Sequence, residues 1–301
     1  MNPNYHHHPS MIQLTFFTIF ALLCTGTATT AGAAELRPET LKAWNDYIAA
    51  AERRMEKELN SSKGFLSLDF QNHQEATRER QSILGGEITV KRVSSSKGDE
   101  DIPVPGGTIH HWRGSIFIPG VPFDFALHRI QHPELETAKQ EDVLESRILE
   151  RLSPEQYRLF LKLQRTQIIT VVYNTEHQIR FRRFADGKVS SNSIAVKIAE
   201  VERLENKLER EKPVGNDRGF LWKMNSYWRY QQVAGGILIE CESVTLSRSV
   251  PFLLEGVTRP VINNIARESM QRTLGELRQR LETAYRNSQS KAALAVADSI
   301  R

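Results

Sequence analysis

Hydrophobic side chains recur at spacings of three and four residues in two long segments, which predicts two amphipathic helices. The first segment covers residues 36–60, where Pro38 suits the first turn. Its apolar stripe consists of Leu41, Trp44, Ile48, Ala51, Met55 and Leu59. The second segment begins at Pro260 and carries a stripe of Val261, Ile265, Met270, Leu274, Leu277, Leu281 and Ala284. At about 25 residues this helix is roughly 37 Å long, enough to cross a whole sheet. A shorter helical pattern covers residues 122–131.

Between the two long helices the chain is rich in short extended segments bounded by turn residues. Strands are expected at residues 87–93, 108–118, 143–149, 157–163, 168–184, 189–201, 219–232 and 236–247. Ser153-Pro154, Asp186-Gly187 and Gly235-Gly236 are tight turn signals, so the strands that they join must pair antiparallel. Residues 94–107 are expected to form a loop, and residues 200–212 a solvated excursion between strands.

The clearest alternation of apolar and polar residues covers residues 221–231. Trp222, Met224, Ser226, Trp228 and Tyr230 share one face, and Lys223, Asn225, Tyr227, Arg229 and Gln231 share the other. This pattern predicts one buried face and one face in contact with water. The long C-terminal helix is the expected cover for the buried face.

Two carboxylates, Glu240 and Glu242, fall on one face of the last predicted strand, about 7 Å apart. Such a pair fits general acid and base catalysis. It also fits a solvated outer face that meets Arg229 on the neighbouring strand. The second interpretation is favoured because Ile239 and Cys241 occupy the more apolar face.

The N-terminus has the architecture of a secretory signal peptide. The apolar run IQLTFFTIFALLC is followed by small residues that end in Ala31-Gly32-Ala33-Ala34. A membrane-spanning helix needs about 20 apolar residues, so no retained anchor is expected. We therefore expect residues 1–34 to be removed and the protein to be secreted, with the periplasm as its compartment. Cys241 would then be the single cysteine, buried and inert, and a hydrophobic core rather than disulfides would hold the fold together.

Composition and charge exclude several classes of protein. With 40% hydrophobic residues the chain is too apolar for wholesale disorder. A net charge of +4, with acidic and basic residues interspersed, is too weak for a nucleic-acid partner. The expected organisation is a helical extension at residues 35–80, a main domain at 81–287 and a flexible Ala-rich tail at 288–301.

Four stretches carry a family resemblance. They are LKAWNDYIAAAERRMEKEL near the N-terminus, GGTIHHWRGSIFIPG (106–120), DRGFLWKMNSYWRYQQVAGGILIECESVTLSRSVP (217–251) and ARESMQRTLGELRQRL (266–281). With the order of elements, they resemble a group of secreted bacterial proteins in the START and polyketide-cyclase superfamily. The resemblance implies an α+β helix-grip fold, in which a curved antiparallel sheet wraps around a long C-terminal helix, with an additional N-terminal helix. It also implies a cavity that in the superfamily takes a sterol, lipid, polyketide or other apolar molecule.

The expected function is therefore the binding of a hydrophobic or amphipathic, lipid-like molecule between the sheet and the C-terminal helix. The residues expected near it are Trp112, Trp222, Met224, Trp228, Tyr230, Ile239 and His110. Two alternatives stay open. One is an enzyme of the cyclase or hydrolase type that uses His110 or Tyr230 as acid or base. The other is an envelope interaction module with a solid core.

No metal, cofactor or catalytic residue is assigned. His110 and His111 are adjacent on one strand and point to opposite faces, so they cannot bind one metal ion together. His177 comes from a distant strand. Asp124, His128 and His132 are four residues apart on the short helix and are read as helix surface.

Overall fold

The computed structural model describes residues 36–93, 102–135, 142–166, 170–184, 187–203, 208–213, 217–248 and 252–299. The predicted signal peptide at residues 1–34 lies outside these ranges, so its removal stays a prediction. Within the described ranges, none of the helices combines the length and the apolar character that a membrane span requires.

A ten-stranded sheet organises the main unit of the chain, and every pairing in it is antiparallel. Its strand order is β1-β3-β10-β9-β7-β6-β5-β4, with β2 added to β3 and β8 added to β7. The strands are β1 (Thr89–Arg92), β2 (Ile102–Val104), β3 (Gly107–Pro119), β4 (Val143–Ser153), β5 (Gln156–Thr166), β6 (Thr170–Phe184), β7 (Lys188–Arg203), β8 (Glu209–Glu211), β9 (Lys223–Val233) and β10 (Gly236–Arg248). The eight predicted strands correspond to β1, β3 to β7, β9 and β10. The short strands β2 and β8 lie where a loop and a solvated excursion were predicted.

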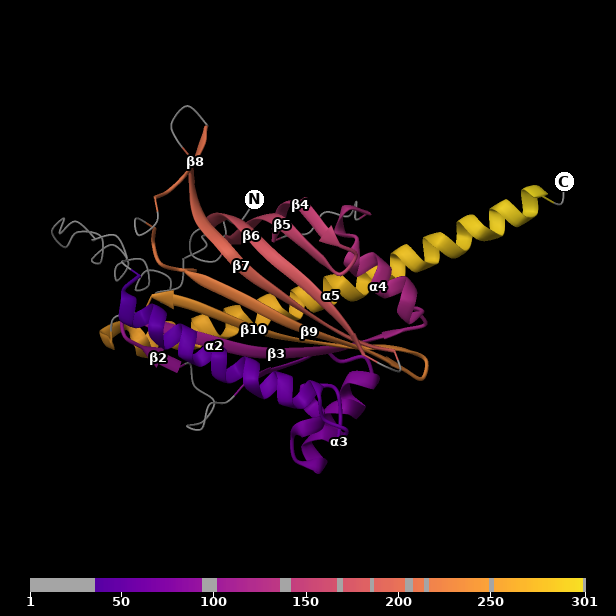
Figure 1. Cartoon of the computed structure of the whole chain (residues 1–301), viewed down its shortest axis with the longest axis horizontal. Helices are drawn as coiled ribbons and strands as arrows, with labels where there is room; N and C mark the ends of the chain where they lie inside the picture. The colour runs from indigo at the N-terminus through magenta and orange to yellow at the C-terminus, as the bar shows by residue number, and fades with distance from the viewer. Residues whose placement is uncertain are drawn as a thin grey trace, which may run out of the picture. The chain divides into compact units, whose positions relative to one another are not determined.

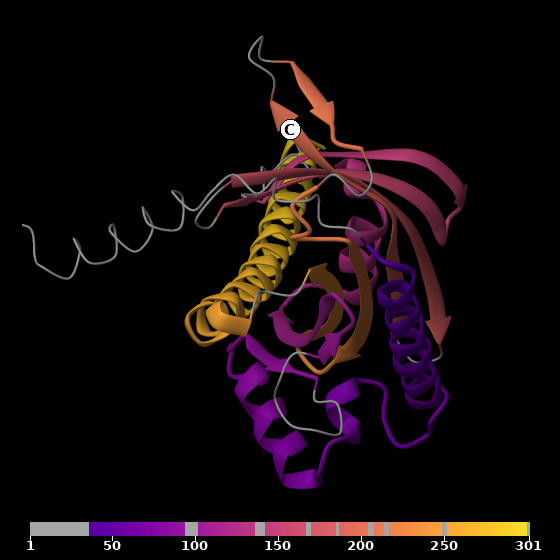
Figure 2. The same cartoon turned by 90° about the vertical axis from the view of Figure 1, so that its left-hand side faces the viewer.

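The long helix α5 (Phe252–Ser299) lies along the concave face of the curved sheet (Figures 1 and 2). Its close approach to β3 requires a glycine. A Cβ atom at Gly114 would lie 2.5 Å from Cδ1 of Leu274 and 2.7 Å from Cγ of Met270. α5 is longer than predicted at both ends. Pro260, expected in the first turn, stands inside the helix, and the Ala-rich residues 288–299 continue the helix.

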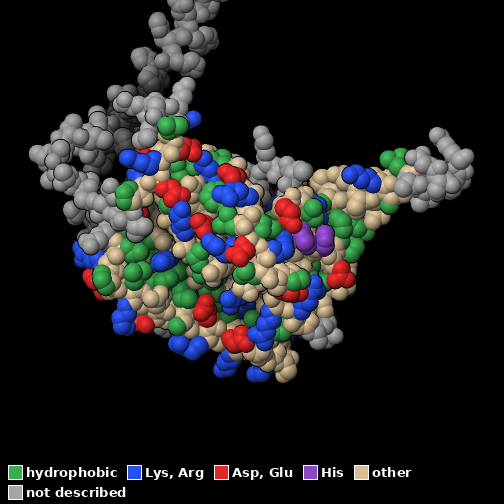
Figure 3. Space-filling view, turned by 45° about the horizontal axis from the view of Figure 1, so that its top comes forward, with side chains coloured by type: hydrophobic (Ala, Val, Ile, Leu, Met, Phe, Trp, Pro, Cys, Tyr) green, Lys and Arg blue, Asp and Glu red, His purple; other side chains and the backbone are tan. Residues whose placement is uncertain are grey.

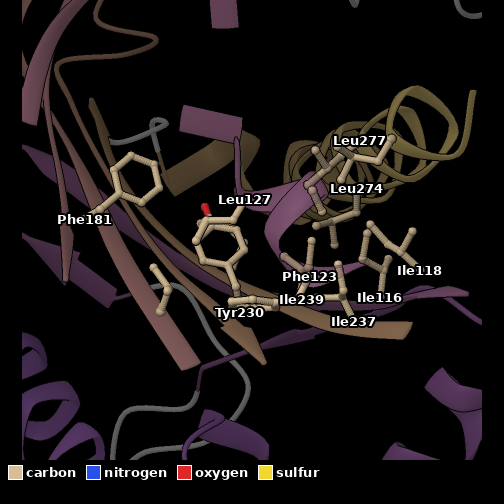
Figure 4. Close-up of a cluster of buried hydrophobic side chains, with 14 of the residues drawn as sticks. Ile116, Ile118, Phe123, Leu127, Phe181, Tyr230, Ile237, Ile239, Leu274 and Leu277 are labelled. Carbon is tan, nitrogen blue, oxygen red and sulfur yellow. The ribbon is translucent and has the colours of Figure 1, made fainter. Parts of the chain in front are cut away.

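The main hydrophobic core fills the space between α5, the short helix α4 (Phe123–Gln131) and one end of the concave face. Figure 4 shows its central side chains, contributed by β3, α4, β6, β9, β10 and α5. They include Ile116, Ile118, Phe123, Leu127, Phe181, Tyr230, Ile237, Ile239, Leu274 and Leu277. The expected α+β helix-grip fold is therefore confirmed: a curved antiparallel sheet holds the C-terminal helix.

The outer face of the sheet is covered by the N-terminal part of the chain. α2 (Pro38–Leu59) is the predicted amphipathic helix, and its Trp44 and Ile48 pack against Ile109 of β3 and Leu246 of β10. A 3-10 turn, η1 (Ser67–Phe70), and α3 (His73–Leu84) follow. α3 was not predicted because its polar sequence HQEATRERQSIL has no apolar stripe.

This cover makes one prediction wrong. The outer face of residues 221–231 was expected to contact water, but Asn225 and Arg229 are buried there, only 6% and 4% exposed. Alternation along a strand separates its two faces correctly. It does not reveal that a polar face is buried by polar partners from another element, and here α2 and η1 supply those partners.

Candidate functional site

The concave face changes from apolar to polar along the central strands. Four apolar residues of neighbouring strands, in register with one another, form a solid row beside α5: Ile116, Ile239, Tyr230 and Val189. Four residues before Ile116 in β3, the aligned row consists of Trp112, Ser243, Ser226 and Ser193. We call Ser243, Ser226 and Ser193 the serine row. It places three small hydroxyl side chains abreast on β10, β9 and β7.

Two hydroxyls of the serine row have no partner in the protein. Within the described part of the chain, the side chains of Ser226 and Ser243 make no hydrogen bond, although Ser226 is only 8% exposed and Ser243 is half-buried. Nε1 of Trp112, at the end of the same row, is buried and also unpartnered. Buried donors are normally paired in native proteins. Nε1 of Trp112 is therefore a buried donor left for another molecule, and the hydroxyls of Ser226 and Ser243 beside it are further donors that no described group occupies.

The third member, Ser193, is held by a short chain of hydrogen bonds. The Thr175 hydroxyl donates to the carbonyl of Leu161 (3.0 Å), so its oxygen accepts from Nε2 of His177 (2.9 Å). Nδ1 of His177 then accepts from the Ser193 hydroxyl (3.1 Å). Burial lowers the pKa of His177 to about 4, so the imidazole is neutral near neutral pH. Both ring nitrogens of His177 are thus occupied within the protein.

We call the serine row, together with Thr175 and His177, the polar strip. A second apolar cluster lies on the other side of this polar strip. Its buried members are Leu163 of β5 and Val171 and Tyr173 of β6, and Met224 of β9 packs against them. The hydroxyl of Tyr173 is buried without a partner, and burial raises its pKa. The concave face therefore carries hydroxyl groups between two apolar surfaces, which is a suitable lining for an amphipathic molecule.

The structure distributes the residues expected near the ligand over several environments. Trp112, Tyr230 and Ile239 belong to the main core, and Trp228 packs against it, half-buried. His110 lies on the same face of β3 as Trp112, with Nε2 3.0 Å from Oγ of Ser247.

Trp222 is separated from the others. It packs with Trp44 on the outer face, and its Nε1 donates to Asp217 (3.2 Å). The alternation used to place it does not extend that far, because β9 begins only at Lys223.

Sequence reasoning missed the serine row. Its signal was available in the alternation of Met224, Ser226 and Trp228, where a small polar residue interrupts an apolar face. The alignment of three such serines on adjacent strands depends on the register of pairing, which a single strand pattern does not contain.

Glu242 lies at the centre of a buried ion-pair network on the outer face. Its carboxylate accepts from Nε2 of His111 (2.9 Å) and from Nη2 of Arg54 in α2 (2.5 Å), and Nδ1 of His111 contacts the hydroxyl of Tyr47 (2.8 Å). Burial alone would raise the pKa of Glu242, but the hydrogen bond from His111 and the charge of Arg54 lower it far below its ordinary value. One ionised carboxylate thus joins β3, β10 and α2.

Glu240 belongs to the same network but has a different environment. It accepts backbone N–H groups of Ser67 (2.6 Å) and Leu68 (3.1 Å) at η1, and Nε atoms of Arg113 and Arg229 lie 3.8 and 4.0 Å away. Burial raises its pKa to about 7, against the opposing effect of the two arginines. The expected pairing with Arg229 is present.

The expected solvation of Glu240 and Glu242 is wrong, since they are 1% and 2% exposed. Both are covered by α2 and η1 and bound to protein groups. This arrangement fixes the N-terminal helices to the sheet and leaves no access for a substrate.

A hollow of about 460 Å³ lies on the outer side of the sheet, beside α2. We call it the outer groove. It is lined by Glu52, Met55, Glu56, Leu59, Arg180, Phe181, Arg182, Ser190, Ser191, Asn192, Tyr227, Trp228 and Arg229. Most of its charges are already paired: Arg182 binds Glu56 (2.8 Å) and Arg229 binds Glu58 (2.5 Å). Tyr227 donates to Glu52 (2.8 Å).

The remaining candidate chemistry is sparse. Within the described residues, no three His, Cys, Asp or Glu side chains are grouped as metal ligands. His128 of α4 stacks on His132, which directly follows the helix, with ring centroids 4.5 Å apart, and His132 contacts Glu134 (2.8 Å). Figure 3 shows acidic and basic side chains interspersed over the face that it presents. Cys241 is free and buried, as predicted, and burial raises the pKa of its thiol.

The chain was compared with known protein families, curated proteins and solved structures. No protein-family model matches the chain, and no curated protein matches it. Among solved structures, it is similar to a STAR-related lipid transfer protein from Xanthomonas axonopodis, with 14% identity, 64% of this chain and 98% of that chain covered, and a TM-score of 0.40. It is also similar to human STARD10, with 9% identity, 77% and 87% covered, and a TM-score of 0.40. A Streptomyces aromatase/cyclase, Zhui, shows 10% identity, 58% and 94% covered, and a TM-score of 0.37.

The helix-grip architecture rests on the sheet topology and the course of α5 in this structure. At such identities and TM-scores, no residue role in this chain rests on these relatives.

Proposed function

We propose that this protein binds one amphipathic, lipid-like molecule between the concave face of the sheet and α5. The observation that carries the proposal is the serine row. Its unpartnered hydroxyls at Ser226 and Ser243 lie on central strands, between the main core and the cluster around Tyr173. A protein that needed only a solid core would carry large apolar side chains at these positions.

The two kinds of surface have different effects on a bound molecule. Apolar walls contribute affinity in proportion to the apolar area that they cover, at about 25 cal/mol per Å². The hydroxyls contribute little net affinity but fix the orientation of a polar group on the ligand. The leader-like sequence of residues 12–34 makes the periplasm the proposed compartment for this binding.

Binding is favoured over catalysis by the state of Tyr230. Its hydroxyl lies 3.1 Å from Oγ of Ser191, and burial raises its pKa above the ordinary value. A phenol whose pKa is raised in this way exchanges protons poorly at neutral pH. His177, a second buried titratable group of the concave face, has both nitrogens bound within the protein.

The test is native mass spectrometry of the full chain purified from a secreting host, followed by extraction and identification of bound lipid. In Ser243→Phe the new ring fills the strip, so the co-purified molecule should be lost while the urea midpoint is maintained. Ser190→Phe is the matched control, because Ser190 is half-buried on the same sheet but lines the outer groove.

A stoichiometric ligand that survives in Ser190→Phe and disappears in Ser243→Phe supports the proposal. The reverse pattern would assign the ligand to the outer groove. A protein that carries nothing, and takes up nothing from a panel of fatty acids, esters and sterols, would contradict binding and favour an interaction module.

A further inference from the structure

We infer that the molecule bound at the serine row presents an uncharged oxygen acceptor, such as an ester or ketone carbonyl, rather than a carboxylate. The inference rests on the proposed binding function and specifies the chemistry of its ligand. It follows from two observations: the polar strip has hydroxyl groups without a protein partner, and its described side chains carry no charge.

Each free hydroxyl of the row has one proton to donate. Ser226 and Ser243 face each other on adjacent strands, and each has a hydroxyl proton that no described group accepts. Adjacent strands lie about 4.8 Å apart, so one carbonyl oxygen between the two hydroxyls can accept from both at about 2.8 Å. Ser193 cannot add a third donor, since its proton is directed to His177.

The described side chains of the strip are neutral. Thr175, His177, Met224 and Thr245 surround the serines, and His177 is uncharged near neutral pH. An ionised carboxylate placed there would lose its hydration without gaining a cation, which is strongly unfavourable.

The charged and titratable groups at the borders of the strip are engaged elsewhere. Arg92 is in register with Trp112, and its guanidinium lies 4.7 Å from the centre of the indole ring. Glu200, in register with Tyr173, is bound by Lys212 (2.7 Å). His110 contacts Ser247.

The test compares two ligands with the same alkyl chain, methyl laurate and laurate, by displacement of the neutral dye Nile red from the full-length protein. At neutral pH the ester should displace the dye at a concentration at least tenfold lower than the acid. Acidification to pH 5 should lower the concentration of acid that displaces the dye several-fold. The reason is that a larger fraction of the acid is protonated at pH 5, because an ordinary carboxyl pKa is about 4.3. The ester should not respond, since it does not titrate.

A double variant tests the residues. Ser226→Ala with Ser243→Ala should weaken the binding of methyl laurate about tenfold, which is the effect of losing one to two hydrogen bonds. Nile red itself should bind as before. Ser190→Ala, on the outer face, should change neither ligand.

The outcomes separate this inference from the proposed function. Laurate that binds as well as methyl laurate at neutral pH would overturn the inference and leave lipid binding intact. Loss of laurate binding in Arg92→Gln would also overturn the inference, by showing that a cationic side chain binds the carboxylate. Failure of Nile red and of both ligands to bind would instead contradict the proposed function.

Discussion

Nε2 of His111 lies 2.9 Å from Oε2 of Glu242, and the two side chains are only 1% and 2% exposed. They are diagonal neighbours on β3 and β10 beneath α2, whose Arg54 and Tyr47 complete the cluster. A polar contact therefore joins the N-terminal helix to the outer face of the sheet, where a purely hydrophobic interface would be the simpler solution. Breaking this contact should be costly, because charged partners would remain buried without compensation.

Glu242→Gln should lower the free energy of unfolding by about 3 kcal/mol. The pKa of Glu242 is lowered in the folded state, so its contribution is complete above the unfolded pKa, about 4.3, and is lost as the pH falls below that value. Urea unfolding measured at several pH values should therefore show a smaller loss of stability on acidification in the variant. Asp46→Asn, which removes an exposed pair with Lys42, is the control and should change stability by less than about 0.5 kcal/mol. Equal effects of the two substitutions would contradict the structural role of the network.

Gly114→Ala should destabilise the protein by about 1–3 kcal/mol, because the new Cβ atom overlaps Leu274 and Met270 of α5. The double variant with Leu274→Ala should be less destabilised than the sum of the single effects, since the smaller side chain makes room. Gly275→Ala in α5 is the matched control: its Cβ would lie 3.4 Å from Ile88, and alanine favours the helix. Thermal unfolding of the parent, the two single variants, the double variant and the control checks this, and strict additivity would show that α5 does not pack on β3 as described.

His177 should make the protein less stable in mild acid. The unfolded chain binds a proton near pH 6.5 and the folded chain only near pH 4, so stability falls by about 3 kcal/mol as the pH drops through this window. Glu240 acts in the opposite sense, because its pKa is raised to about 7 and its ionisation disfavours the folded state as the pH rises. The two effects offset each other in the parent protein.

Substitution separates the contributions of His177 and Glu240 to the slope of stability against pH. His177→Gln should be less sensitive to acid than the parent, and Glu240→Gln more sensitive. Urea midpoints between pH 4.5 and 7 give both slopes. Two variants with the slope of the parent protein would show that neither group titrates in this range.

Ser226→Val should separate stability from function. Valine fills part of the polar strip and removes an unpaired hydroxyl, so it should raise the free energy of unfolding by about 1 kcal/mol. The same change should reduce binding of the co-purified molecule at least tenfold, because it removes a donor and occupies its space. Urea unfolding and native mass spectrometry on the same sample provide both values. Reduced stability with unchanged binding would show that Ser226 serves only the fold.

Sequence patterns predicted the elements that a single periodicity defines. The apolar stripes of α2 and α5 and the alternation along β9 are local properties, so the division of these elements into two faces followed from spacing alone. Burial of Glu240 and Arg229 did not follow, because it depends on η1 and α2, which meet the strands from far away in the chain. The alignment of Ser193, Ser226 and Ser243 likewise depends on the register of three strands.

Photo-crosslinking tests the central claim most directly. The full-length protein, loaded with a methyl ester that carries a diazirine on its alkyl chain, would be irradiated, digested and mapped by mass spectrometry. The account predicts labels on residues of the concave face that do not line the outer groove, such as Met224 and Thr245. Labels confined to Met55, Leu59 and Tyr227 would place the ligand in the outer groove and contradict the proposed binding site.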